Sequence, residues 1–391
     1  METDNYSFKL CRHFGQCGGC RFQDIPYPDQ LLRKEELCRK LGGEAEIDLP
    51  LLPIVPSPQI YYYRNKMEFT FADQGGELRL GLHCRDRKRE VFDLQECLIS
   101  SPAVPVIVEA VRRFARESGR PAYDIFRHTG FWRNLVIREG KFTGQIMVNL
   151  VTTSGGNIDL RPLADLLFSL KIREKITSLI QTGNDSLSNA VVPQSISVIR
   201  GKDSLEERLD GLTFQIAPFS FFQVNPFIIR VFYRKLLEYL HPGGEETVCD
   251  LYCGMGPISL VLAGGVNRVL GIEKEEGSIA AARRHAALNK IENTTFLAGE
   301  ARKILLEERE NLKNQIDIMV INPPRAGLSK KVRKRVKEIR PRTIVYSSCN
   351  PATFFANLPD FLEDYTVEII QPFDFFPHTP HLEVLGILRL K

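Results

Sequence analysis

The sequence contains no apolar run long enough to cross a membrane. A transmembrane helix needs about 20 consecutive apolar residues, and the longest apolar runs of this chain are far shorter. The first residues, Met-Glu-Thr-Asp-Asn-Tyr-Ser, are polar and acidic, so we expect neither a signal peptide nor a transit peptide. Internal repeats and low-complexity tracts are also missing. We therefore expect a cytoplasmic protein with no membrane partner.

Charge of one sign is not in large excess either. A net charge of +4 permits a polyanionic partner such as RNA, but it identifies none. The 391 residues, 43% hydrophobic and 26% charged, exclude extended disorder and predict more than one core. In a reducing compartment the nine cysteines are interpreted first as metal ligands, nucleophiles or core residues, and only then as disulfides.

The first 215 residues predict two segments. Residues 1–98 form a turn-rich lobe with a short helix at 27–41 and a β-rich stretch at 61–98, in which Gly75-Gly76 marks a hairpin turn. Residues 99–215 predict a mixed α/β layer. Its expected elements are helices at 102–118 and 160–170 and strands at 134–138, 144–150, 176–181 and 195–199. A junction is expected at 210–225, where Pro218 and a run of phenylalanines break the pattern.

Residues 216–391 alternate strands and helices regularly, which predicts a parallel, doubly wound sheet. After a helix at 227–240, the expected parallel strands are 247–251, 268–273, 295–298, 316–321 and 343–347. The last two strands, 366–371 and 384–390, have no helix between them and should pair antiparallel. An α/β sheet that ends in an antiparallel hairpin is typical of Rossmann-like methyltransferases.

A glycine loop after the first of these strands predicts a nucleoside cofactor. In Asp250-Leu-Tyr-Cys-Gly-Met-Gly-Pro257, Gly254 and Gly256 allow a tight turn and a close approach to a ligand. Glu273 ends the next strand, where a carboxylate can hold ribose hydroxyls. The dinucleotide fingerprint requires a third glycine or an alanine where this chain has Ser259, so S-adenosylmethionine (SAM) is favoured, with Asp250 beside its cationic end. Alternatively, Asp250 only braces the turn.

Three further candidate site residues are expected at the edge of this sheet. Cys349 follows the apolar strand 343–347, at the edge where α/β sheets build their sites, although an incidental or buried cysteine is the alternative. Asn322 precedes two prolines that make its loop rigid, so its side-chain amide can form hydrogen bonds with a planar ring. Alternatively, this loop is only a rigid connector. Glu383 opens an apolar strand, where desolvation raises a carboxyl pKa and suits it to accept a proton.

Four other cysteines predict a metal site in the N-terminal lobe. Cys11, Cys17 and Cys20 form a CxxxxxCxxC pattern, and Cys97 ends a β-rich stretch. A local triplet with one distant cysteine favours a [4Fe-4S] cluster. Four thiolates suit structural zinc equally well, so zinc is the alternative.

These motifs together resemble the RNA uracil-5-methyltransferase family over nearly the whole chain. They occur in the order of that family: CxxxxxCxxC with Cys97, Phe222-Gln-Val-Asn225, Asp250-Leu-Tyr-Cys-Gly-Met-Gly256, Asn322-Pro-Pro-Arg325, Ser347-Ser-Cys-Asn350 and His378-Thr-Pro-His-Leu-Glu-Val384. The resemblance implies SAM-dependent methylation of C5 of a uridine in RNA. It also implies that Cys349 is the nucleophile, that Glu383 is the proton acceptor, and that the cofactor is contacted by Gln223, Tyr252, Glu273 and Asn322.

The branch of the family is suggested by two departures from its common pattern. Asn322 replaces the aspartate of many members, and because Cys11 comes so early we expect no N-terminal TRAM domain. Both features resemble the iron–sulfur, RumB-type branch, which implies 23S rRNA as the substrate ahead of tRNA, and a monomer is expected. Two alternatives belong to other classes: an NAD-dependent iron–sulfur oxidoreductase and a non-catalytic, zinc-stapled RNA-binding module.

Overall fold

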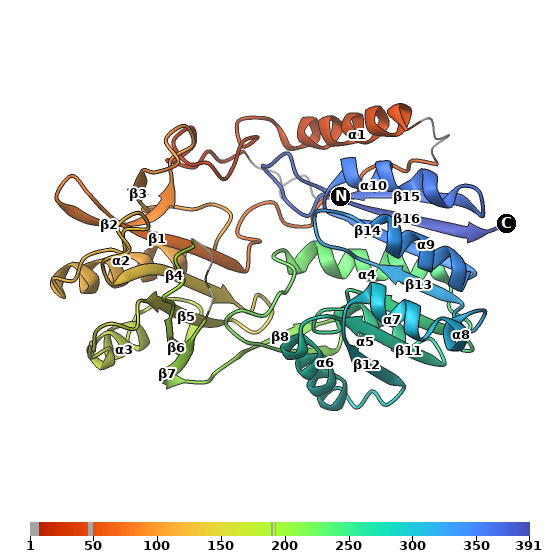
Figure 1. The fold of residues 1–391 in the computed structure, drawn as a ribbon. Coiled ribbons are helices and arrows are strands. Elements are labelled where there is room, and N and C mark those ends of the chain that lie inside the picture. The colour runs from red at the N-terminus through yellow and green to blue at the C-terminus, as the bar shows by residue number, and fades with distance from the viewer. Residues whose placement is uncertain (1–7, 46–49, 189–190, 192) are drawn as a thin grey trace.

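The chain folds into two α/β layers that lie side by side. The computed structural model describes residues 8–45, 50–188, 191 and 193–391. These residues form two seven-stranded sheets and one separate two-stranded hairpin. In Figure 1 the first sheet lies on the left, in orange to yellow-green, and the second lies on the right, in green-blue to blue.

The first sheet has the order β3-β2-β1-β4-β5-β6-β7. Its helices, α2 (Ala103–Glu117) and α3 (Arg161–Phe168), share one apolar core with the sheet. The expected hairpin turn is confirmed, because Gly75 and Gly76 both have positive φ and join two antiparallel strands. The sheet takes strands from both sides of residue 98. The strands are β1 (Lys66–Gln74), β2 (Glu77–His83), β3 (Val91–Asp93), β4 (Trp132–Glu139), β5 (Gln145–Thr152), β6 (Lys175–Gly183) and β7 (Ser195–Gly201).

The second sheet has the order β12-β11-β10-β13-β14-β16-β15, and it confirms the predicted Rossmann-like architecture. Strands β10 to β14 are parallel, while β16 runs antiparallel to both of its neighbours. The last two strands therefore pair as the sequence predicts. The strands are β10 (Thr247–Leu251), β11 (Arg268–Glu273), β12 (Thr294–Ala298), β13 (Ile318–Ile321), β14 (Thr343–Ser348), β15 (Tyr365–Phe373) and β16 (Glu383–Leu390).

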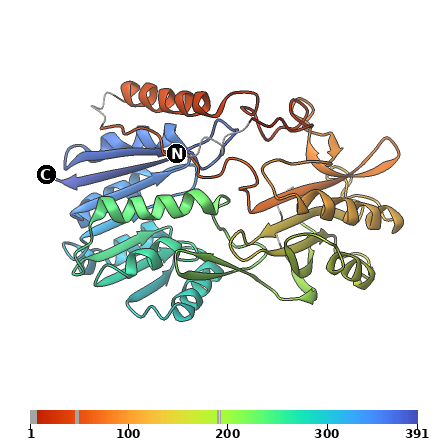
Figure 2. The same ribbon diagram turned by 180° about the vertical axis from the view of Figure 1, so that it is seen from behind.

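Helices cover both faces of the second sheet, so each face has its own apolar core. Figure 2 shows α4 lying across one of these faces. That face is covered by α4 (Pro226–Leu240), α5 (Pro257–Ala263) and α6 (Glu276–Leu288). The other is covered by α1 (Tyr27–Glu44), α7 (Ala301–Glu307), α8 (Arg309–Leu312), α9 (Lys330–Ile339), α10 (Pro351–Asn357) and the 3-10 helix Leu358–Phe361. None of the helices in the described part of the chain is long and apolar enough to span a membrane.

Before the chain forms the first sheet, helix α1 and the stretch that follows it pack against the second sheet. Helix α1 packs on α10, above the sheet in Figure 1. Further along, Leu51 pairs with Ile370 and Val55 with Phe373, so this extended stretch lies along β15. The helix expected at 27–41 is thus present, but it packs against the C-terminal sheet. This placement brings N-terminal side chains close to the last loop of the protein.

A β-hairpin that was not among the expected elements connects the two layers. It consists of β8 (Leu205–Leu209) and β9 (Leu212–Ile216), and its two-residue turn is Asp210-Gly211. Both turn residues have positive φ, as a tight hairpin turn requires. Asp210 also accepts hydrogen bonds from Arg230 and Arg234 of α4, which ties the hairpin to the second layer.

Candidate active site

The carboxyl ends of the parallel strands gather the predicted site residues at one edge of the second sheet. Asp250 lies at the end of β10 and Glu273 is the last residue of β11. Asn322 follows β13, and Cys349 follows β14. Glu383 starts β16, which runs the opposite way, so it reaches the same edge: Ser348 of β14 is paired with Val384. Residues from five strands can therefore act on one ligand.

The glycine loop has a backbone that leaves room for a ligand. Tyr252, Gly254 and Gly256 all have positive φ, at 62°, 55° and 85°. A Cβ on Gly256 would lie 3.1 Å from the Cβ of Ala282, so the tight packing and the positive φ both favour glycine there. A Cβ on Gly254 would meet nothing within 4 Å, so open space borders the loop. The amide of Gly254 donates to Oε2 of Glu273 over 3.3 Å, which places this carboxylate against the loop.

Asp250 lies behind the glycine loop. It is 1% exposed, and its Oδ2 accepts a 2.6 Å hydrogen bond from the hydroxyl of Ser259 in the first turn of α5. Burial raises the pKa of Asp250 to about 7. Its Oδ1 is buried and has no hydrogen-bond partner among the described residues. The bond to Ser259 matches the bracing alternative, while Oδ1 leaves one acceptor for another partner.

Cys349 and Glu383 face each other across the ends of two strands. Glu383 is 3% exposed, and its Oε1 accepts a 2.5 Å hydrogen bond from the hydroxyl of Ser347. Burial raises the pKa of Glu383 to about 7, and the bond from Ser347 opposes that rise. Burial also raises the pKa of the partly exposed Cys349 thiol, the charge of Glu383 raises it further, and Arg325 lowers it. The register of β14 and β16 and the hydrogen bond from Asn350 to the carbonyl of Arg325 bring these three residues to one place.

Hydrogen bonds connect the loops around Cys349. Asn350 donates from Nδ2 to the carbonyl of Arg325 over 3.1 Å, and the Arg325 guanidinium lies 3.3 Å from Nδ1 of His381. The backbone amide of Asn322 donates to the backbone carbonyl of Leu251 over 3.4 Å. The Pro-Pro loop thus contacts the ends of β10, β14 and the last loop. No local pattern in the sequence indicates a role for Arg325 or His381, since only the fold brings them together.

The loop that carries Gln223 is held by the first sheet. Asn65 donates from Nδ2 to the carbonyl of Gln223 over 2.9 Å, and Nε of Arg138 donates to the carbonyl of Pro218 over 2.8 Å. Asn225 then caps α4, since its side chain accepts from the first amides of that helix. The first layer therefore orients a loop of the second, which sequence reasoning could not foresee.

The four cysteines of the N-terminal lobe lie in one region. Burial raises the pKa of Cys11 to about 11, and it also raises the pKa of Cys17 and of Cys20. The thiol of Cys11 donates over 3.9 Å to the carbonyl of Glu96, the residue before Cys97, so the distant fourth cysteine is near the triplet. Across the described ranges, however, no group of three or more His, Cys, Asp or Glu is arranged to hold a metal ion. The cluster therefore stays a prediction.

Known proteins are similar in sequence to this chain over most of its length. Residues 197–391 match the family tRNA (uracil-5-)-methyltransferase. An RNA methyltransferase of Clostridium tetani, itself uncharacterized, is 38% identical over 385 residues, which are 97% of this chain and 84% of that protein. A similar protein of Caldanaerobacter subterraneus, also an uncharacterized RNA methyltransferase, is 37% identical over 382 residues, again 97% and 84% of the two chains.

A solved structure is similar over the whole fold. The Pyrococcus abyssi tRNA (uracil-54, C5)-methyltransferase, in complex with S-adenosyl-L-homocysteine, has a TM-score of 0.78 and 30% sequence identity. The match covers 97% of this chain and 88% of that one. Both layers, and the edge where the candidate residues gather, lie within the matched length. This chain therefore belongs to the RNA uracil-5-methyltransferase family of SAM-dependent enzymes.

Proposed function

We propose that this protein transfers a methyl group from SAM to C5 of a uridine in RNA through a covalent bond between Cys349 and C6 of the base. The observation that carries the proposal is the pairing of Cys349 with the buried Glu383 at the edge where the glycine loop also ends. The NAD-dependent oxidoreductase and the zinc-stapled binding module give no reason for that pair.

The thiol is needed because C5 of uracil is a poor nucleophile. Addition of the Cys349 thiolate to C6 pushes the C5=C6 electron pair into an enolate, and C5 then attacks the SAM methyl group. The sulfonium leaves as S-adenosylhomocysteine. Arg325 lowers the pKa of the thiol and so favours the thiolate, in opposition to burial and to Glu383. The target uridine must leave its stack to reach this edge.

Glu383 then completes the reaction. C5 of the adduct carries both the new methyl group and its original proton, and Glu383 accepts that proton. The C5–H electron pair re-forms the C5=C6 bond, the C6–S bond breaks, and Cys349 leaves as a thiolate. The Ser347 hydroxyl holds the carboxyl in place at 2.5 Å.

We assign the binding of SAM to the glycine-loop side of the edge. Glu273 would hold the ribose hydroxyls, because its carboxylate already lies against the loop. The open space beside Gly254 fits a close approach by the nucleoside. We propose that the remaining contacts to SAM come from residues in and around this loop: Gln223, Tyr252, Asn322, Asp250, Gly254 and Gly256.

Release of the product should slow in acid. Glu383 must be a carboxylate to accept the C5 proton, and burial raises its pKa to about 7. Below that pKa the carboxylate fraction falls about tenfold for each pH unit, and the decay of the methylated adduct should fall with it. Quenched single-turnover reactions between pH 5.5 and 8 measure this rate. An adduct decay that is independent of pH over that range would exclude Glu383 as the base.

The RNA substrate that we propose is 23S rRNA, with the protein acting as a cytoplasmic monomer. The resemblance of its motifs to the RumB-type branch supports rRNA, whereas the Pyrococcus abyssi enzyme acts on tRNA. Purified protein should be given SAM with an isotopically labelled methyl group and either 23S rRNA or total tRNA, and labelled nucleosides should be analysed by mass spectrometry. We expect 5-methyluridine in the rRNA. Label in tRNA alone would change the substrate to tRNA, and no 5-methyluridine in either RNA would contradict the proposed function.

We also propose that Cys11, Cys17, Cys20 and Cys97 hold a [4Fe-4S] cluster that stabilises the N-terminal lobe. All four lie in one partly buried region, and Cys thiolates are the usual ligands of such clusters. Anaerobically purified protein should be brown and contain about four iron and four sulfide per chain. Cys17→Ser should lose the iron, while Cys38→Ser, which alters a buried core thiol of α1, should keep it. Colourless protein with zinc would contradict the assignment.

A further inference from the structure

The connection between β15 and β16 is anchored at Glu383 itself. In the register of this hairpin, Phe373 at the end of β15 is paired with Glu383 at the start of β16. Residues 374–382, here called the 374–382 loop, leave the sheet beside Glu383 and return to it there. The arrangement of this loop therefore bears directly on the backbone position of Glu383.

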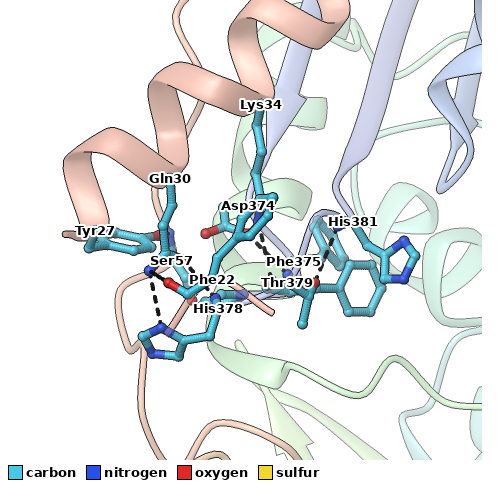
Figure 3. A network of polar contacts seen from close by, with 12 residues as sticks. Phe22, Tyr27, Gln30, Lys34, Ser57, Asp374, Phe375, His378, Thr379 and His381 are labelled. Carbon is cyan, nitrogen blue, oxygen red and sulfur yellow. Dashed lines mark hydrogen bonds and ion pairs between the residues drawn. The ribbon is translucent and has the colours of Figure 1, made fainter. Parts of the chain in front are cut away.

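A buried ion pair joins the first residue of the 374–382 loop to α1. Nζ of Lys34 lies 2.6 Å from Oδ1 of Asp374, and the side chains are 1% and 0% exposed. Nζ also donates to the carbonyl of Phe376 over 3.1 Å, while Oδ1 of Asp374 accepts from the amide of Phe376. Figure 3 shows Lys34 reaching down from α1 into the loop. The amine of Lys34 thus binds the loop at two positions, Asp374 and Phe376.

The middle of the same loop is held by a side chain one helical turn earlier in α1. The side chain of Gln30 accepts from the amide of His378 at 2.9 Å, and its Nε2 lies 3.2 Å from Nδ1 of His378. The His378 carbonyl accepts from the amides of Arg21 and Phe22, both at 2.9 Å. The residues that follow Cys20 are therefore bonded to this loop as well.

Hydrogen bonds continue from Lys34 toward the site. The hydroxyl of Thr379 donates to the carbonyl of Phe376, which Lys34 also binds, and it accepts from the amide of His381. His381 lies beside Arg325, and two residues later the chain reaches Glu383. Two additional bonds to loop carbonyls come from Tyr63 and Asn225.

A buried ion pair is a poor source of stability, because well-packed apolar residues of similar size often stabilise a protein as much. Its directional contacts do restrict a loop to one arrangement. We infer that Lys34 and Asp374 are positioning residues for proton removal: they hold the 374–382 loop so that Glu383 faces the adduct on Cys349. This inference rests on the proposed function, and it adds a step-specific role for an N-terminal helix.

The test compares Lys34→Met and the double variant Lys34→Met/Asp374→Leu with Lys40→Met. The double variant leaves no unpaired buried charge, and Lys40 is a 73% exposed lysine of the same helix. With SAM and ordinary RNA, we expect the first two variants to accumulate the methylated covalent adduct, while turnover falls about 10- to 100-fold. SAM affinity should stay within about twofold, because the loop is not part of the proposed SAM site. Lys40→Met should behave as the unaltered protein.

Two outcomes would overturn the inference. One is turnover of the double variant equal to that of Lys40→Met, without adduct. The other is joint loss of SAM binding and adduct formation in the double variant, because the pair would then serve folding alone. Glu383→Gln, measured in parallel, separates this inference from the mechanism. If Glu383→Gln traps RNA and the double variant does not, only the positioning role fails; if Glu383→Gln itself traps nothing, the proposed mechanism fails.

Discussion

The Cys349→Ala variant should bind SAM normally and yet form no 5-methyluridine. Without the thiolate, no electron pair is pushed into C5, so the base cannot attack the methyl group. Loss of a covalent nucleophile commonly lowers kcat by at least about 10⁴-fold. Transfer of a labelled methyl group to RNA measures the loss, and calorimetric titration with SAM checks the binding site.

Cys38→Ala is the matched control for this variant, since Cys38 lies on the buried face of α1 and not at the sheet edge. It should keep methyl transfer. A fully active Cys349→Ala protein would show that another group adds to the base or that no addition occurs, and the mechanism would have to be abandoned.

The Glu383→Gln variant should accumulate RNA that is already methylated and still attached to the protein. Glutamine has nearly the same shape, and its carbonyl oxygen can still accept from Ser347, but it cannot take up the C5 proton. Addition and methyl transfer should therefore proceed, while release stops. A denaturing gel with labelled RNA detects the complex, and its intact mass should include one methyl group.

Glu368→Gln provides a control on the same sheet, because Glu368 lies on β15 in a partly exposed pair with Arg389. It should release its product at the normal rate. Normal turnover by Glu383→Gln, with no trapped RNA, would assign the proton acceptor to another residue.

The strands of the second sheet were predictable because each is a short apolar, β-branched run that ends at a loop. The segments 247–251 and 268–273 agree with β10 and β11 to the residue, since parallel strands are buried on both faces. The hairpin of β8 and β9 was missed, although Asp210-Gly211 between alternating residues is a strong turn signal. The charged residues of Leu205–Leu209 obscured that alternation.

The candidate site was predictable only where a residue's place on a strand decides its surroundings. Cys349 and Glu383 follow or begin strands, so the topology alone brings them to one edge. The contacts of Lys34 with Asp374 and of Gln30 with His378 join residues 340 and 348 positions apart, and no local pattern indicates them. In the sequence Lys34 is one of several charged residues of its helix, and only packing shows that it is buried.

For Asp250, too, the sequence predicts the position of the residue but not the contacts of its side chain. Its position before the glycine loop predicts a role at the SAM site, whereas the bond of Oδ2 to Ser259 and the burial behind the loop, which leave only Oδ1 for a ligand, follow from packing. The direction of a single side chain depends on the packing of α5 against β10, which the residue types do not specify.

The most direct test uses RNA in which the target uridine is 5-fluorouridine. Fluorine at C5 cannot leave as a cation, so an adduct that has accepted the methyl group cannot break down by loss of a proton. The unaltered protein with SAM should form a stable covalent complex, and digestion should yield a peptide in which the RNA is attached to Cys349. Absence of a complex, or attachment at another cysteine such as Cys253, would contradict the assignment of Cys349 as the nucleophile.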